Sequence, residues 1–261
     1  MSKFKAVVFD WAGTTIDFGS FAPMGVFVEA FARFDIDVTI DEARKPMGMP
    51  KWHHIKAMLA QPRIASAWQD RYGAAPTDSD VDKVYEVFVP MNEQIVAQYA
   101  TLVPGAKATT DWLRARGIKI GSTTGYTRSI MAKVLPVAAE QGYSPDNLVC
   151  ADDLSEGRPG PLGMYQCFVD LGVYPPSAVI KVDDTEPGIA EGVAAGCVTV
   201  GVTLSGNYAG KTPEELSALT PDQLDELRQT AAAKLTAAGA DHVIDTVADL
   251  PALIESLERS G

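Results

Sequence analysis

Residues 6–15 read Ala-Val-Val-Phe-Asp-Trp-Ala-Gly-Thr-Thr, and this stretch decides the fold that the sequence predicts. Four apolar residues followed by a carboxylate and a Gly-Thr-Thr turn are typical of a buried strand in a parallel sheet. Ligands of open α/β sheets bind outside the carboxyl ends of the strands. The sequence therefore places Asp10 where chemistry is expected. Two residues later, where a second acid could assist, it has Ala12.

The remainder of the chain falls into two patterns. Between residues 20 and 100 the apolar spacing predicts helices only, at 24–34, 40–45, 51–59, 62–72 and 77–99. From residue 104 onward, helices alternate with strands predicted at 118–123, 148–151, 179–182, 198–202 and 242–244. This alternation is typical of βαβ units and a parallel sheet. We expect an α/β protein with a doubly wound, Rossmann-like core, residues 1–20 and 101–261, and an inserted all-helical cap domain, residues 21–100.

The composition argues against several classes of function. With 261 residues, 46% of them hydrophobic and 21% charged, the chain is long enough for one large domain with a smaller insert. Its formal net charge of -12 argues against nucleic acid or an anionic membrane as a partner. The three cysteines form no CxxC pair, which predicts neither disulfides nor a zinc site and fits a cytoplasmic location. The first strand starts too early for a signal peptide, and no apolar run reaches the ~20 residues of a membrane helix.

Polar side chains follow four of the predicted core strands. They are Asp10, Thr124, the pair Asp152-Asp153 and the pair Asp183-Asp184. Each could be a helix cap, but the carboxyl ends of parallel strands share one edge, so together with Arg158 they indicate a site there. Neighbouring carboxylates suit a hard divalent cation such as Mg²⁺. An arginine and the turn at Gly125 suit an oxyanion such as phosphate.

These motifs resemble those of the haloacid dehalogenase superfamily: Phe-Asp-x-Ala-Gly-Thr at 9–14, Ser-Thr-Thr-Gly at 122–125 and Asp-Asp-Thr at 183–185. The resemblance implies that the first Asp is a nucleophile that becomes an aspartyl phosphate. A Thr and a basic residue then hold the phosphoryl group, and a late acid binds magnesium. These roles fall on Asp10, Thr124, Arg158 and Asp184. The superfamily often has Gly in the place of Asp183, so either late acid could contact the metal, and position favours Asp184.

Ala12 occupies the place where most phosphatases of the superfamily carry a second Asp, which protonates the departing alcohol. Loss of general acid catalysis costs on the order of 10²–10⁴-fold in rate. Either the enzyme is poor, or its leaving group needs no acid. A carbon leaving group fits the second option, because the electrons of a broken C–P bond can be taken up by an iminium that a lysine forms with a neighbouring aldehyde. Residues 44–51 of the cap supply candidate lysines.

Within the superfamily the chain most closely resembles the phosphonatase family, whose members hydrolyse phosphonoacetaldehyde to acetaldehyde and phosphate. The matching segments are 10–15, 21–23, 42–48, 121–128 and 157–159. The resemblance implies that Lys51 forms the Schiff base, with Met47 and His54 around it and Tyr126 close by.

The same resemblance implies a metal site, an assembly and a metabolic role. Asp10, the backbone carbonyl of Ala12 and Asp184 would bind Mg²⁺. The protein would be a homodimer in the degradation of 2-aminoethylphosphonate. The helix expected at 24–34 is our candidate for the dimer interface, because its aromatic face could exceed what the cap core needs.

Other interpretations remain open. Lys51 could be an ordinary surface lysine, and Lys45 and Lys56 are its rivals. A lysine at a helix start is electrostatically disfavoured, however, which lowers its pKa as a nucleophilic amine requires. His54 lies three residues from Lys51, on the same helix face. The alternatives for the whole protein are a phosphate-ester phosphatase, a dehalogenase or a silent phospho-ligand-binding protein; Ala12 disfavours the first and Asp10 the last.

Overall fold

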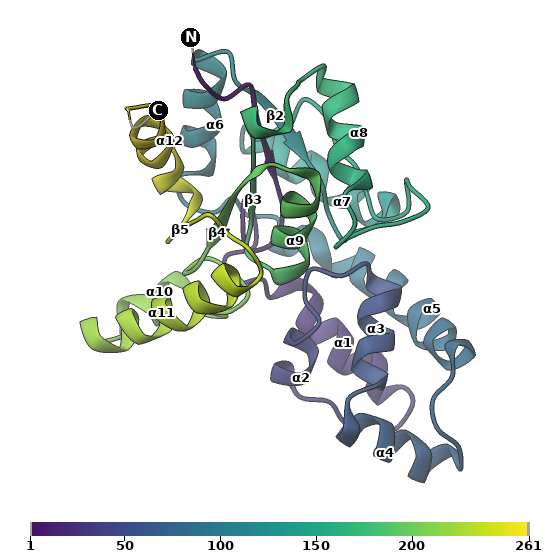
Figure 1. Cartoon of the computed structure of the whole chain (residues 1–261). Coiled ribbons are helices and arrows are strands. Elements are labelled where there is room, and N and C mark those ends of the chain that lie inside the picture. Colours follow the sequence, from purple (N-terminus) through teal and green to yellow (C-terminus); the bar gives the residue numbers. More distant parts are fainter. Residues whose placement is uncertain (1, 260–261) are drawn as a thin grey trace.

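The computed structural model describes residues 2–259 and contains one five-stranded parallel sheet with helices on both faces (Figure 1). The strand order is β2-β1-β3-β4-β5. The strands are β1 Ala6–Phe9, β2 Lys119–Ser122, β3 Val179–Asp183, β4 Val198–Val202 and β5 His242–Ile244. This arrangement confirms the predicted α/β, doubly wound fold class.

The helices fall into two sets along the chain. Between β1 and β2 lie α1 Ala22–Ala32, α2 Ile40–Arg44, α3 Lys51–Leu59, α4 Pro62–Tyr72, α5 Asp78–Ile95, the 3₁₀ helix η1 Val96–Tyr99 and α6 Ala106–Ala115. After β2 follow α7 Arg128–Glu140, α8 Leu162–Leu171, η2 Pro176–Ala178, α9 Glu186–Ala195, α10 Pro213–Ser217, α11 Pro221–Ala237, η3 Val247–Asp249 and α12 Leu250–Arg259.

The side chains of β1 explain why helices cover both faces of the sheet. Val7 and Phe9 belong to an apolar cluster that includes residues of α6 and α12. Ala6 and Val8, which alternate with them, belong to a cluster on the other face that includes residues of α8 and α9. Because successive strand residues point to opposite faces, a fully apolar strand must be covered on both sides.

One predicted strand is wrong. Residues 148–151 do not join the sheet, and only an isolated bridge pairs Val149 with Thr123. The side chains of Asp152 and Asp153 explain why the segment turns instead. Asp152 accepts a hydrogen bond from the backbone of Arg128, and Asp153 accepts one from the backbone of Cys150. These local bonds compete with a sheet ladder, as is usual for Asp in turns.

Helices α1 to α5 have a hydrophobic core of their own. Its buried members run from Met24 to Phe88 and include Phe27, Phe31 and Trp68. Figure 1 shows these helices as a group beyond the sheet edge. We keep the name cap for residues 21–100, and the two-domain division at these boundaries stays a prediction. The prediction that the aromatic face of helix 24–34 exceeds what the cap core needs is wrong, because Phe27 and Phe31 are fully buried within the single chain.

The chain passes between cap and core twice, and the two passages are bonded to each other. The backbone N–H of Asp17 donates to Thr101 O at 3.0 Å, and that of Val103 donates to Thr15 O at 2.9 Å. Ile16 and Leu102 form an antiparallel bridge between these bonds. The cap is therefore attached to the core by one short two-stranded ribbon.

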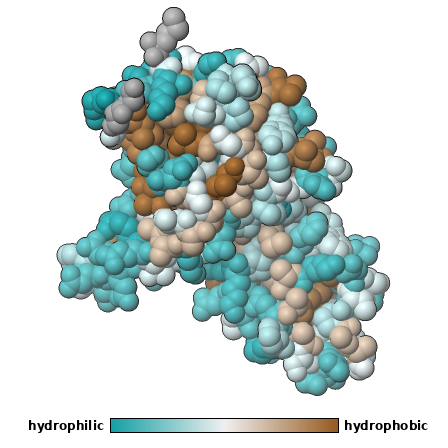
Figure 2. All heavy atoms as spheres, in the orientation of Figure 1, coloured by the Kyte–Doolittle hydropathy of each residue, from teal (hydrophilic) through white to brown (hydrophobic). Residues whose placement is uncertain are grey.

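Helices α10 and α11 project from the body of the protein and have a mostly polar surface. No residue of α10 is buried, and α11 buries only Ala231 and Leu235. Figure 2 shows hydrophilic residues over this projection. Within residues 2–259, none of the helices combines the length and the apolar character needed to span a membrane.

Candidate active site

The strand register brings three acids together at the carboxyl edge of the sheet. Phe9 pairs with Ser122 on one side and with Val182 on the other, so the residues that follow these strand ends are neighbours. Carboxylate oxygens of Asp10, Asp183 and Asp184 all lie within 4.8 Å of one another, and all three side chains are buried. This is the cluster that the sequence predicted from the ends of β1 and β3.

Arg158 reaches into this cluster from the loop before α8. Its Nη1 lies 2.8 Å from Asp10 Oδ1 and 3.3 Å from Asp183 Oδ2. The guanidinium also donates from Nη2 to the carbonyl oxygen of Thr123 at 2.8 Å. Arg158 is thus fixed beside Asp10, where a phosphoryl group attached to that residue would lie.

Two charged residues that the sequence reasoning missed complete the network. Lys181, inside β3, places Nζ 3.0 Å from Asp183 Oδ2 and 3.2 Å from Glu191 Oε2. Glu191, on α9, also pairs with Arg158 Nε at 3.1 Å. The Thr123 hydroxyl accepts from both Lys181 and Arg158, and it donates to Glu191 at 2.8 Å. The sequence around a buried lysine in a strand, or a buried glutamate in a helix, looks the same as the sequence around an exposed one. No sequence signal therefore marked Lys181 or Glu191.

The acid cluster fits a divalent cation. Four carboxylates in this buried network face two paired cations, which leaves two negative charges in excess. Burial, followed by the charges of Asp10 and Asp183, raises the pKa of Asp184 well above its usual value. Burial and the charge of Asp183 raise the pKa of Asp10 to about 6. A positive charge beside them would favour the ionised form of both groups.

The backbone on the side of residue 13 packs closely against the Asp184 carboxylate. Gly13 has a positive φ of 86°, and a Cβ added there would come within 2.2 Å of Asp184 Oδ2. Thr14 Oγ1 and the backbone N–H of Asn207 donate to the two carboxylate oxygens at 3.2 Å and 2.7 Å. The carboxylate is therefore oriented by neutral donors and is kept clear of side chains on the side of residue 13.

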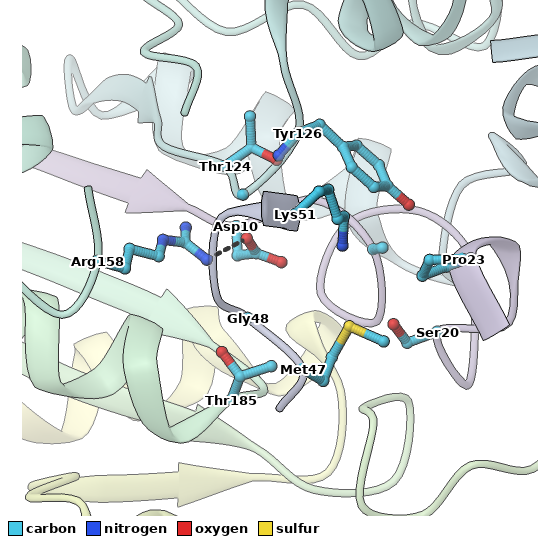
Figure 3. Close-up of a pocket in the computed structure, with 12 residues that line it drawn as sticks. Asp10, Ser20, Pro23, Met47, Gly48, Lys51, Thr124, Tyr126, Arg158 and Thr185 are labelled. Atoms are coloured by element: carbon cyan, nitrogen blue, oxygen red, sulfur yellow. Dashed lines mark hydrogen bonds and ion pairs between the residues drawn. The ribbon is translucent and has the colours of Figure 1, made fainter. Parts of the chain in front are cut away.

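A small cavity lies between these strand ends and the cap. Figure 3 shows Lys51, at the start of α3, and Asp10, at the end of β1, pointing into it. Of the predicted site residues, those that line the cavity are Asp10, Ala12, Met47, Lys51, Thr124, Gly125, Tyr126 and Arg158. Asp184 lies beside Asp10 in the acid cluster.

Among the three lysines considered, only Lys51 faces the cavity. Its side chain is 4% exposed, and Nζ lies 4.9 Å from the centroid of the Tyr126 ring. Lys45 is exposed, and Lys56 is paired with Asp78 at 2.7 Å. The pKa of Lys51 is lowered to about 8 chiefly by burial, which outweighs the nearby charge of Asp10. The expected direction is thus confirmed, with burial as the main cause.

His54 lies behind Lys51 and does not line the cavity. Its Nε2 donates to the carbonyl oxygen of Ala43 at 2.8 Å, and its ring stacks on Phe27 at 4.0 Å between centroids. Burial, and then the charge of Lys51, lowers the pKa of His54 well below its usual value. The imidazole is therefore neutral and supports the helix that carries Lys51.

Ser20 is a cavity residue that the sequence reasoning missed. Its hydroxyl is buried with no hydrogen-bond partner, and its backbone has a positive φ of 53°. A non-glycine residue in this conformation carries a local backbone cost and is often found at functional sites. Nothing in the spacing of residues 16–23 singled it out. Pro23, Gly48 and Thr185 also line the cavity without having been predicted.

The predicted role of Asp152 and Asp153 at the site was wrong. They do not line the cavity with Asp10. Both are exposed and interact with Arg128 at the start of α7. They act as local caps, the ordinary role of acids after a short apolar run.

The cap loop lies directly against the core at two glycines. A Cβ at Gly48 would come within 2.2 Å of Thr185 Oγ1, and one at Gly125 would lie 3.0 Å from the carbonyl oxygen of Met49. Only residues without a side chain allow this approach. The structure is therefore a closed form in which cap and core jointly bury Lys51.

Replacing Gly48 by alanine should keep the cap from closing. We expect kcat/KM to fall on the order of 10²-fold, because a displacement of about 1 Å at the reacting groups has such an effect. The left-handed backbone should also lower the free energy of unfolding by roughly 1–2 kcal/mol. Gly73→Ala is the matched control, since Gly73 has φ 77° in the cap but no neighbour within 4 Å. Equal activity losses in the two variants would contradict the steric explanation.

The comparisons with known proteins agree with this fold and site. A family model described as haloacid dehalogenase-like hydrolase matches residues 4–196. The fold, with its acids at the strand ends and an inserted set of helices, is that class of hydrolase.

More specific relatives lie within this class. A phosphonoacetaldehyde hydrolase of Paraburkholderia xenovorans is 52% identical over 258 residues, covering 99% of this chain and 97% of the relative. One of Klebsiella pneumoniae is 47% identical, covering 98% and 96%. The crystal structure of a phosphonoacetaldehyde hydrolase-like protein from Oleispira antarctica has a TM-score of 0.96 at 46% identity, covering 98% of this chain and 93% of that one. The chain belongs to the phosphonoacetaldehyde hydrolase family.

Proposed function

We propose that this enzyme hydrolyses the C–P bond of phosphonoacetaldehyde, giving acetaldehyde and phosphate. The observation that carries the proposal is a buried amine, Lys51, and a buried carboxylate, Asp10, that line one cavity (Figure 3). Ala12 lines the same cavity, where an ester phosphatase would need an acid. The names of the relatives support this choice of substrate.

The direct test is product stoichiometry. Purified enzyme with Mg²⁺ and phosphonoacetaldehyde should release acetaldehyde and inorganic phosphate in equal amounts, measured by a coupled alcohol dehydrogenase assay and by phosphate colorimetry. Glycerol 3-phosphate and ethyl phosphate, which are esters of ordinary alcohols, serve as comparison substrates. Faster turnover of an ester than of the phosphonate would favour the phosphatase alternative.

The first step is imine formation at Lys51. The neutral amine attacks the aldehyde carbon, and the carbinolamine loses water to give the iminium. The lowered pKa of Lys51, about 8, leaves a useful fraction of the amine neutral at physiological pH. Tyr126, whose ring lies 4.9 Å from Nζ, and Met47 enclose the organic part of the substrate.

The second step breaks the C–P bond. A carboxylate oxygen of Asp10 attacks phosphorus in line, and the electron pair of the C–P bond moves into the iminium to give an enamine. Arg158 and Thr124 hold the phosphoryl oxygens, and the turn at Gly125 brings the backbone close to them. The result is an aspartyl phosphate on Asp10 and an enamine on Lys51.

The last steps restore the enzyme. The enamine takes up a proton on carbon and becomes the imine of acetaldehyde. Water then attacks the aspartyl phosphate and releases phosphate from Asp10, and a second water hydrolyses the imine last and frees Lys51. The closed cap limits access of bulk water to both intermediates.

We propose Mg²⁺ as the cofactor, held by Asp10, the Ala12 carbonyl and Asp184, with Asp183 oriented by Arg158 and Lys181. When bound, Mg²⁺ neutralises charge on the phosphoryl group and lowers the repulsion between that group and Asp10. The buried cluster of Asp10, Asp183 and Asp184 supports this assignment. Arg158 and Thr124 position the phosphoryl group beside this site.

The same proposal includes a division into two domains, a dimeric assembly and a metabolic role, all of which the family resemblance implies. Residues 1–20 and 101–261 act as the core domain and 21–100 as the cap domain. The enzyme works as a homodimer in 2-aminoethylphosphonate degradation. Light scattering on the purified protein measures its oligomeric state.

The pH dependence of kcat/KM should follow the Lys51 amine. Below a pKa of about 8 the amine is protonated and cannot attack, so kcat/KM should rise about tenfold per pH unit and level off above it. Rates of imine formation between pH 6 and 11 measure this. An inflection at the ordinary lysine value of 10.5, or a flat profile from pH 7 to 9, would show that the buried amine is not the nucleophile.

A further inference from the structure

Arg44, the last residue of α2, joins the cap to the core. Its Nη1 donates to the carbonyl oxygen of Gly19 at 2.8 Å and to Asn207 Oδ1 at 3.2 Å. It also lies within hydrogen-bond distance of the carbonyl oxygens of Ser20 and Asn207. The guanidinium stacks over the Phe21 ring at 5.0 Å from its centroid. One cap side chain thus contacts both the ribbon that leads into the cap and the loop after β4.

Asn207 is hydrogen-bonded both to Arg44 and to Asp184 of the acid cluster. Its Nδ2 donates to the Arg44 carbonyl oxygen at 3.4 Å, so the two residues exchange hydrogen bonds. Its backbone N–H donates to Asp184 Oδ2 at 2.7 Å, and its side chain is 3% exposed. The loop has little freedom here, because a Cβ at Gly206 would come within 2.6 Å of the Asp184 side chain.

We infer that Arg44 and Asn207 are positioning residues that couple closure of the cap to the orientation of the Asp184 carboxylate. The inference rests on the metal site proposed above. The sequence of contacts runs from α2 through Arg44 to Asn207 and then to Asp184. When the cap is closed, Arg44 fixes Asn207, and the Asn207 N–H holds one carboxylate oxygen so that the other is presented to the metal. An open cap lacks the Arg44 bond and leaves this loop less constrained.

The charge of Arg44 supports the same role. The negative charge of Asp184 acts to raise the pKa of Arg44, although burial lowers it more. The Nη2 atom of Arg44 is buried without a hydrogen-bond partner. Arg44 is half-buried, and a buried donor without an acceptor costs free energy. Partners that orient metal ligands from behind typically change metal affinity by 10–100-fold when removed.

The test is metal affinity, measured without substrate. Mn²⁺ binding to the full-length protein is followed by the electron paramagnetic resonance signal of free Mn²⁺ in wild type, Arg44→Met, Asn207→Ala and the double variant. We expect each single variant to bind Mn²⁺ about tenfold more weakly. The double variant should be no weaker than either single one, because both remove the same link. Arg63→Met is the matched control, since Arg63 is a cap arginine that contacts Glu42 and Asp37 within the cap.

A second measurement uses the reciprocity of coupled sites. If closure strengthens metal binding, Mg²⁺ must favour closure by the same factor. Mg²⁺ should therefore slow acetylation of Lys51 by acetic anhydride in wild type, read by peptide mass spectrometry against the exposed Lys45. This protection should be lost in Arg44→Met and retained in Arg44→Lys.

The outcomes separate this inference from the proposed function. Wild-type affinity for Mn²⁺ in Arg44→Met and Asn207→Ala, with Mg²⁺ protection of Lys51 intact, overturns the coupling and leaves the metal site in place. Failure of the wild type itself to bind Mn²⁺ would instead overturn the metal site. If Arg44→Met does not fold, as judged by circular dichroism, Asn207→Ala decides, because it keeps the backbone donor to Asp184.

Discussion

Lys51→Ala should lose C–P bond cleavage on the order of 10⁴-fold or more, as expected when the residue that forms the covalent intermediate is removed. Without the iminium, the electrons of the broken bond have no acceptor and the carbanion is not stabilised. Sodium borohydride added with phosphonoacetaldehyde should trap a reduced adduct in the wild type, and peptide mass mapping should place it on Lys51. The variant should show no adduct.

Two other cap lysines provide the controls. Lys45→Ala and Lys56→Ala change exposed side chains that lie outside the cavity, so both should keep the adduct and the activity. If the Lys51 variant still cleaved phosphonoacetaldehyde, or if the wild type gave no adduct, the imine mechanism would be wrong. An ester phosphatase on the same fold would not need the amine.

Asp10→Asn should abolish phosphate release while leaving imine formation intact. The amide has nearly the same shape but is too weak a nucleophile to attack phosphorus, so we expect a loss on the order of 10⁴-fold or more. Borohydride should still trap the Lys51 adduct, because Asp10 acts only after the iminium has formed. Phosphate release and adduct yield on the same sample measure the two steps separately.

Asp152→Asn is the control for this experiment. Asp152 follows an apolar run as Asp10 does, yet it lies outside the cavity and accepts a hydrogen bond from the Arg128 backbone. Its replacement should leave turnover unchanged, and stability nearly so, because the amide oxygen of asparagine can still accept from the Arg128 N–H. Loss of imine formation in Asp10→Asn would mean that the carboxylate also serves the first step, contrary to the order of events proposed here.

The sequence predicted the fold class and the acid cluster because the carboxyl ends of neighbouring parallel strands meet at one edge of the sheet. The cap residues Met47 and Lys51 were predicted from the family resemblance. Once β1 and β3 are recognised as buried strands, Asp10 and Asp184 must meet at one edge of the sheet. The wrong strand at 148–151 shows the limit of the same reasoning. A short apolar run does not reveal whether its backbone pairs, and here two following aspartates supply competing hydrogen bonds.

Residues whose role depends on tertiary packing could not be found this way. Lys181 is fully buried inside a strand, but alternation alone would not distinguish it from a lysine at a sheet surface. Ser20 matters because its hydroxyl faces a cavity formed by segments far apart in the chain. His54 shares a helix face with Lys51, as the spacing predicted, but packing against Phe27 and Ala43 turns it away from the cavity.

The paired ribbon at Asp17 and Thr101 has a consequence for how such an enzyme can be built. Because both crossings meet at hydrogen-bonding distance, the whole set of helices enters the core at a single point. The inserted helices interrupt the chain only between β1 and β2, and their other contacts with the core, such as those of Gly48 and Arg44, are made through space. In the mechanism proposed above, the core supplies the groups that transfer phosphorus and the inserted helices supply the amine, so the two contributions come from opposite sides of this ribbon.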